Sequence, residues 1–171
     1  VTNADDFQVL NLDDTLISQD GTDYFISDFE RTYKSITSER ISVETAQNLI
    51  HKYFLKTVYE STRSLFFKAI QQDHKRRYTI NDSIVLTMKD GAEVSVVVVQ
   101  RKGKVSTKQP AILIASIYVG TNEPGAMLSA SKGYVGVIAN TRGKRLSKSE
   151  VKPLEHENSD VYEVIDWISK Q

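Results

Sequence analysis

AILIAS at residues 111–116 and YVGVIAN at residues 134–140 are the two stretches that decide the fold. Both runs are apolar at successive positions, whereas a strand with one solvated face alternates apolar and polar residues. Continuous apolar character is typical of strands that helices cover on both faces of a sheet. The two runs therefore predict an α/β fold, with residues 111–116 in a central position of the sheet.

Two earlier strands and two helices extend this pattern through the second half of the chain. The strands are predicted at residues 83–88 and 93–99, and the helices at residues 126–131 and from about residue 158 onward. The Asp90-Gly91 pair lies between the first two strands, and we interpret it as hairpin turn chemistry rather than as a site. Strands that alternate with helices in this order indicate an α/β layer.

Residues 1–78 have a different pattern, which is polar with helical periodicity. The first twenty residues are rich in Asp, Asn and Gln and are interpreted as an arm or loop, and a short helix is predicted at residues 24–34. A longer helix begins after Ser42, a good N-cap residue, and is broken or kinked near Ser61-Thr62. Its apolar residues recur at three- and four-residue spacing: Ala46, Leu49, Ile50, Tyr53, Phe54, Val58, Leu65, Phe66, Ala69 and Ile70. We interpret them as packing against a partner surface rather than as a cofactor site.

Composition excludes several classes of function. Lys and Arg number 22 and so do Asp and Glu, so the formal net charge is zero and gives no electrostatic basis for nucleic-acid or anionic-membrane binding. The chain has no cysteine, which excludes disulfides and thiolate or zinc-thiolate chemistry. No apolar run is long enough to span a bilayer. The first residues lack signal-peptide features, so a signal peptide was either never present or has been removed.

Standard catalytic motifs are missing from the 171 residues. The sequence has no Gly-x-Ser-x-Gly elbow, no P-loop and no His-Glu-x-x-His helix. The dinucleotide-binding glycine set is also incomplete, which disfavours nucleotide binding on a Rossmann-like sheet. The histidines, His51, His74 and His156, do not have metal-ligand spacing and are interpreted as surface or helix residues. Residue chemistry alone therefore gives no complete catalytic constellation.

A series of short motifs in the second half carries a family resemblance. They are Met88-Lys89-Asp90-Gly91, Pro110-Ala111-Ile112-Leu113-Ile114 followed by Ile117-Tyr118-Val119-Gly120, Lys132-Gly133-Tyr134-Val135-Gly136-Val137, Asn140-Thr141-Arg142-Gly143-Lys144-Arg145-Leu146-Ser147, and residues 160–171. In this order and spacing, the stretch from about Tyr78 to Gln171 resembles the opening of the cocaine-esterase and X-prolyl dipeptidyl-peptidase family of α/β-hydrolases. The helical first half lies outside the family's common pattern.

The resemblance implies the N-terminal part of an α/β-hydrolase sheet, with helices on both faces, preceded by a helical segment. The expected boundaries are 1–78 for the helical segment and 79–171 for the first half of the hydrolase domain. The expected function is that of a secreted or periplasmic serine hydrolase, which acts on ester or X-Pro-type peptide substrates by acyl transfer without a metal or organic cofactor. The nucleophile, acid and histidine of its triad would lie beyond Gln171, so the chain alone is expected to be inactive.

One catalytic role is implied by the resemblance within this chain. Tyr118 occupies the position whose hydroxyl supplies an oxyanion-hole donor in the family, and such a donor stabilises the charge that develops on the substrate carbonyl. The alternative for Tyr118 is a packing aromatic at the end of a strand. The family usually has Asp where this sequence has Asn140, and Arg142 is expected to tie down the following loop through a buried ion pair.

The family order of strands also makes a prediction about partners. It places the four strands as first, second, fourth and third across the sheet, which leaves the strand Ala111–Ser116 without its outer neighbour. An unpaired strand edge is a template for another chain. We therefore expect the rest of the hydrolase fold, or a second copy, at this edge. The alternative to a hydrolase is a self-contained, non-catalytic α/β binding or interaction module.

Overall fold

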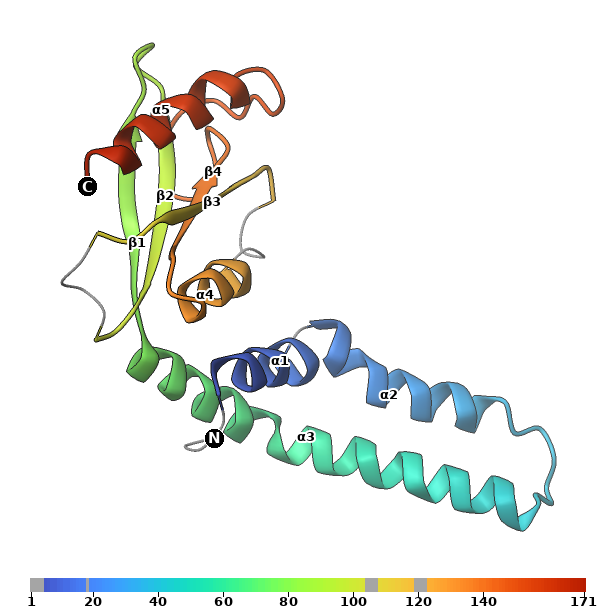
Figure 1. Ribbon diagram of the computed structural model, residues 1–171. Helices are drawn as coiled ribbons and strands as arrows, with labels where there is room; N and C mark the ends of the chain where they lie inside the picture. The colour runs from blue at the N-terminus through green and yellow to red at the C-terminus, as the bar shows by residue number, and fades with distance from the viewer. Residues whose placement is uncertain (1–4, 18, 104–107, 119–122) are drawn as a thin grey trace. The chain divides into compact units, whose positions relative to one another are not determined.

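The computed structural model describes residues 5–17, 19–103, 108–118 and 123–171, and it divides the chain into two compact units, Val1–Asp73 and His74–Gln171 (Figure 1). Val119 and Gly120, which belong to one of the motifs above, lie outside the described residues. Among the described residues, no helix is long and apolar enough to cross a membrane.

The first unit is helical from its first described residues. Helix α1 spans Asp6–Ile17, where the sequence predicted an arm or loop, and this prediction was wrong. A capping box starts the helix, because Asp5 Oδ1 accepts from the Gln8 amide at 2.8 Å and Gln8 Oε1 accepts from the Asp5 amide at 3.1 Å. The Asp-x-x-Gln spacing was therefore a readable start signal in a segment that looked like a polar loop.

Helices α2 (Gln19–Lys34) and α3 (Val43–Arg77) lie side by side in the first unit (Figure 1). Ser42 caps α3 as predicted, since its Oγ accepts from the Thr45 amide at 3.1 Å. The helix is continuous over 35 residues, so no break occurs near Ser61-Thr62. The two hydroxyls there donate to the Val58 carbonyl at 2.9 and 2.6 Å, so both are hydrogen-bonded without an interruption of the helix.

The second unit contains a four-stranded sheet. Its strands are β1 (Tyr78–Thr87), β2 (Glu93–Arg101), β3 (Ala111–Ser116) and β4 (Val135–Asn140). The order across the sheet is β1-β2-β4-β3, which confirms the predicted order. Strands β1, β2 and β4 pair antiparallel, whereas β3 and β4 run parallel. The fold is therefore α/β, as predicted.

Helices cover both faces of this sheet. On one face, Val164 of α5 (Glu157–Ser169) packs against a core that includes Val96 and Val137. On the opposite face lies α4 (Glu123–Ser131), and it approaches β4 closely at Gly136. A Cβ at Gly136 would lie 2.2 Å from the Ala126 carbonyl oxygen, so only glycine allows this contact. Alternation along β4 puts Val137 and Gly136 on opposite faces.

Strand β3 is an edge strand here, which differs from the central position that its apolar run predicts. Its six residues are half-buried or exposed, and the Ile112 side chain is 40% exposed. A strand that is apolar on both faces can be covered by helices on both faces, but this pattern does not show that a further strand pairs with its edge. The outer edge of β3 is consequently the open side of the sheet among the described residues.

Candidate functional site

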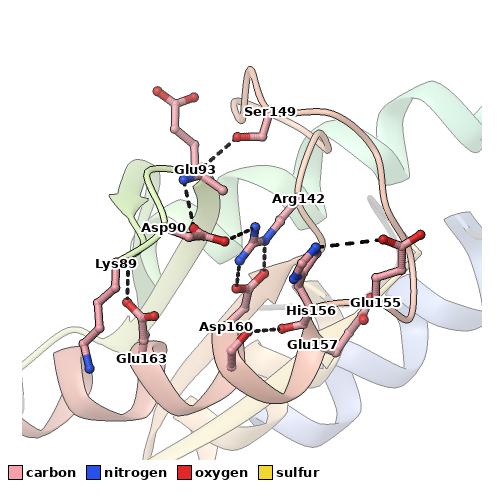
Figure 2. Close-up of polar contacts among 12 residues, drawn as sticks. Lys89, Asp90, Glu93, Arg142, Ser149, Glu155, His156, Glu157, Asp160 and Glu163 are labelled. Atoms are coloured by element: carbon pink, nitrogen blue, oxygen red, sulfur yellow. Dashed lines mark hydrogen bonds and ion pairs between the residues drawn. The ribbon is translucent and has the colours of Figure 1, made fainter.

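Arg142 stands at the end of the sheet where β4 leaves the core, and its guanidinium is held between two carboxylates (Figure 2). Nε and Nη2 donate to the two carboxylate oxygens of Asp160 at 2.7 and 2.5 Å, which is a bidentate fork. Nη1 donates to Asp90 Oδ2 at 2.6 Å. Arg142 and Asp160 are each 7% exposed, so the predicted buried ion pair is confirmed.

This network joins three elements that are far apart in the sequence. Asp90 lies in the β1–β2 turn, Arg142 follows β4, and Asp160 is in the first turn of α5. The turn has the hairpin chemistry predicted for it, because Gly91 has a φ of 85° and the Asp90 carboxylate accepts from the Ala92 amide at 3.1 Å. Asp90 therefore serves the turn and also pairs with Arg142, a second role that its place in a turn did not indicate.

The charges in the network shift one another's protonation. Hydrogen bonds to Asp160, and then to Asp90, raise the pKa of Arg142 despite the opposing effect of burial. The Ala92 amide and then the Arg142 side chain lower the pKa of Asp90. Arg142 and Asp90 therefore keep their opposite charges near neutral pH.

The loop after β4 is also fastened to the start of β2. Ser147 Oγ donates to the Glu93 carbonyl at 2.8 Å and accepts from the Gly143 amide at 2.9 Å. The Glu93 amide donates to Ser149 Oγ at 2.8 Å, and the Glu93 carboxylate accepts from the Lys148 amide at 2.8 Å. Sequence analysis missed these contacts, because serines in a polar loop carry no signal that identifies their partners.

Two polar side chains at the base of this loop, Asn140 and Glu157, are hydrogen-bonded. Asn140 is buried, and its Nδ2 donates to the Ser95 carbonyl at 3.1 Å. An ionised carboxylate at this position could not donate that bond. Nearby, Glu157 Oε1 accepts from the Leu154 amide at 2.6 Å and from Thr141 Oγ1 at 3.5 Å. Burial opposes ionisation of Glu157, but backbone donors led by Leu154 bring its pKa below the usual value.

Tyr118 lies at the same end of the sheet, in the segment that follows β3. The Tyr118 amide donates to Ser116 Oγ at 3.0 Å, and that hydroxyl donates to the Tyr118 carbonyl at 3.1 Å. The parallel ladder continues past the strand, since the Thr141 amide donates to the Ser116 carbonyl at 3.2 Å. The Tyr118 side chain is 70% exposed, so it is not packed into the described core.

Two hollows are lined by described residues of this unit, and neither is a closed substrate site. A hollow beside Arg142 and Glu157 has a volume of about 20 Å³, room for little more than a water molecule. A groove of about 910 Å³ lies on the α5 face, at the opposite end of β3 and β4 from Tyr118. It is lined by side chains such as Gln100, Ala111, Val135 and Ile168, and it is sheet surface that α5 leaves uncovered. Within the described part of the chain, no group of three or more His, Asp or Glu side chains could hold a metal ion.

The segment that contains the whole Asp90–Arg142–Asp160 network is also the segment that has known relatives. Residues 90–171 match the X-Pro dipeptidyl-peptidase (S15) family. The predicted resemblance to this family is thereby confirmed over residues 90–171. The S15 match begins at Asp90, within the hairpin turn, and reaches Gln171, so the loop after β4 and α5 lie inside it. No curated protein matches the chain significantly.

Several solved structures are similar to part of this chain. An α-amino acid ester hydrolase is 21% identical over 56% of this chain and 19% of its own, with a TM-score of 0.45. An aminopeptidase from a marine sediment Thaumarchaeota archaeon is 20% identical over 56% of this chain and 19% of its own, with a TM-score of 0.43. An esterase is 18% identical over 55% of this chain and 30% of its own, with a TM-score of 0.44. The chain thus spans less than a third of the length of these proteins.

Proposed function

We propose that this chain is part of a serine hydrolase that cleaves ester or X-Pro-type peptide bonds by acyl transfer. The observation that carries the proposal is the S15 match over residues 90–171. The sheet order β1-β2-β4-β3 and the anchored loop after β4 are consistent with it. Residues 79–171 would form the first part of the hydrolase domain and residues 1–78 a helical segment before it. Nucleophile, acid and histidine would come from outside residues 1–171, and no metal or organic cofactor would be needed.

Tyr118 is our candidate for an oxyanion-hole donor. It follows the carboxyl end of β3, an edge of α/β sheets where ligands commonly bind. Its backbone is held by the Ser116 hydroxyl, whereas its side chain is 70% exposed. A phenol hydroxyl at that edge can donate to a carbonyl oxygen that becomes negative during serine attack. The packing alternative for Tyr118 has no support in the burial of the described residues.

The open edge of β3 is the proposed junction with the rest of the hydrolase. Ile112 is 40% exposed, and β3 has no outer neighbour among the described strands. Pairing with a further strand would satisfy the outward backbone groups and cover this side chain. Hydrogen exchange across residues 111–116 tests the junction, with weak protection expected in the 171-residue chain and strong protection in the longer protein. A stable 171-residue monomer with strong protection would instead favour the non-catalytic α/β module.

The test of the enzymatic proposal is covalent labelling of the longer protein that contains residues 1–171. A fluorophosphonate should label one activated serine and abolish hydrolysis of p-nitrophenyl acetate and of X-Pro p-nitroanilides together. Peptide mapping by mass spectrometry should place the label outside residues 1–171. Treatment with EDTA is the control and should leave the rate unchanged.

Two results would contradict the proposal. One is a labelled serine within residues 1–171, and the other is turnover that survives complete labelling. Comparing the two substrates also separates esterase from peptidase specificity, which the S15 match leaves open. The expectation of a secreted or periplasmic enzyme remains a prediction.

A further inference from the structure

Helix α3 runs beside α2 (Figure 1). It has two apolar faces, and only one of them contacts α2. On the packed face, Tyr53 and Tyr59 have ring centroids 5.5 and 5.3 Å from those of Phe29 and Phe25 in α2. Lys52 pairs with Asp28 at 2.9 Å on the same side. These aromatic and charged contacts show which face of α3 packs against α2.

The second face is an exposed apolar stripe. Its members are Val43, Ile50, Phe54, Val58 and Leu65, whose exposed fractions are 75%, 68%, 61%, 39% and 68%. At about 100° per residue these positions fall within roughly 80° of one another, on the side of the helix away from Tyr59. The other two positions inside this sector are Gln47 and Ser61, so the stripe contains no charged residue from position 43 to position 65.

The spacing of the stripe is symmetric about its central residue. Ile50 and Val58 lie four positions on either side of Phe54, and Val43 and Leu65 lie eleven positions on either side. The two polar residues of the sector, Gln47 and Ser61, lie seven positions on either side of Phe54. A two-fold axis through Phe54 would therefore match each residue with one of its own kind. It would set Phe54 against Phe54, Ile50 against Val58, and Val43 against Leu65.

We propose that α3 pairs antiparallel with α3 of a second copy of this chain, about a two-fold axis at Phe54. A two-fold interface uses the same patch on both copies, so it requires self-complementarity of this kind. Binding of a different protein would require only that this face of α3 be apolar, and would not require the residues before and after Phe54 to match. Antiparallel packing also sets the helix dipoles in the favourable sense.

The size of the stripe sets the expected strength of the pairing. From position 43 to position 65 the helix rises about 33 Å, and with a width of about 10 Å the footprint is roughly 330 Å² per copy. Stable complexes of standard size bury about 800 Å² per partner. The pairing should therefore be a weak, concentration-dependent dimer rather than a permanent one.

Cysteine cross-linking can test the register directly, because the chain contains no cysteine of its own. Phe54→Cys should form a disulfide-linked dimer at micromolar protein in a glutathione buffer, at least tenfold faster than Asn48→Cys. Asn48 is also exposed on α3 but lies off the stripe, so it is the matched control. In mixtures of two tagged chains, Ile50→Cys should cross-link with Val58→Cys faster than either variant does with itself.

The alternatives give different results in the same experiment. Equal rates for Phe54→Cys and Asn48→Cys would overturn the proposal, as would fast linkage of Ile50→Cys to itself, which indicates parallel helices. Sedimentation supplies a second measurement, in which Phe54→Glu should shift the 171-residue chain toward monomer and retain its helical circular dichroism. Association that survives Phe54→Glu but is lost in Ile112→Lys would place the contact at the β3 edge and also overturn the proposal.

Discussion

Replacing Asp160 by Asn should destabilise the second unit more than replacing Asp90, the other carboxylate of the Arg142 network, by Asn. The Asp160 carboxylate accepts two hydrogen bonds from the guanidinium, at 2.5 and 2.7 Å. An amide of the same size retains one acceptor oxygen and places an N–H₂ donor against an N–H of Arg142. The substitution therefore leaves a buried cation with one good partner fewer and one repulsive contact.

The magnitude follows from burial. Both side chains of the pair are about nine-tenths buried, with side-chain exposures of 8% and 10%. Removing one partner of a buried ion pair costs about 3–5 kcal/mol, because the remaining charge is left uncompensated. Asp90 continues to neutralise part of that charge, so we expect about 3 kcal/mol, at the lower end of that range. Asp90→Asn should have a smaller effect, because the Asp90 side chain is 48% exposed and its interaction is screened by water.

Urea denaturation of both variants, followed by circular dichroism at fixed low protein concentration, measures this difference. The double variant Arg142→Met with Asp160→Leu is the control for the mechanism, since removing both charges should recover much of the loss caused by Asp160→Asn. If Asp160→Asn is no more destabilising than Asp90→Asn, the fork does not anchor the loop. If the double variant is as unstable as the single one, packing rather than charge explains the loss.

Three further predictions concern the rest of the second unit. Gly136→Ala should lower the free energy of unfolding by about 1–3 kcal/mol in urea titrations, because its Cβ would lie 2.2 Å from the Ala126 carbonyl oxygen. Gly125→Ala is the control and should cost less, because its Cβ would meet only the flexible end of a side chain at 3.1 Å. Equal losses in the two variants would contradict the close approach of α4 to β4 at Gly136. In the longer enzyme, Tyr118→Phe should lower kcat by about 10²–10³ with little change in KM, and wild-type steady-state kinetics would reduce Tyr118 to a structural residue. The lowered pKa of Asp90 means that its ionised form stabilises the fold at neutral pH, and this contribution is lost as the pH falls below about 4. In Asp90→Asn, the free energy of unfolding should therefore fall less steeply with decreasing pH in this acidic range. An unchanged dependence on acidic pH would contradict the pairing of Asp90 with Arg142.

The topology of the second unit could be predicted because its signals are local. The apolar run at Ala111–Ser116 has the same bounds in the structure as in the sequence prediction, and the strand order follows the family resemblance. Strand β1 begins five residues earlier than predicted, at Tyr78, because the exposed residues Thr79 and Asn81 pair with β2 although they are polar. Polar residues on an edge strand satisfy the backbone ladder without an apolar pattern, so periodicity does not reveal them.

The helical unit shows a second limit of pattern reasoning. The predicted stripe on α3 mixed residues such as Tyr53, which contacts α2, with residues such as Ile50, which does not. Three- and four-residue spacing detects that a helix is apolar, but a helix with two apolar faces satisfies the same rule as a helix with one broad face. Only the position of α2 divides the residues between the two faces.

The Arg142 network shows why a site is harder to predict than the fold that holds it. The sequence indicates a buried ion pair for Arg142, since a charge in a loop between two buried elements needs a partner. It does not indicate which carboxylates supply that partner. Asp160 is 18 positions away and Asp90 is 52 positions away, whereas Glu150, Glu155 and Glu157 all lie nearer in the sequence. The choice depends on where β2, β4 and α5 meet, and this is a property of the assembled sheet. The partner of Asn140 could not be predicted either. Its amide can donate a hydrogen bond that an ionised aspartate cannot, but only the structure shows that the Ser95 carbonyl accepts it. Local sequence therefore determines which buried polar groups need a hydrogen-bond or ion-pair partner, and the packing of the sheet and α5 determines which residues supply that partner.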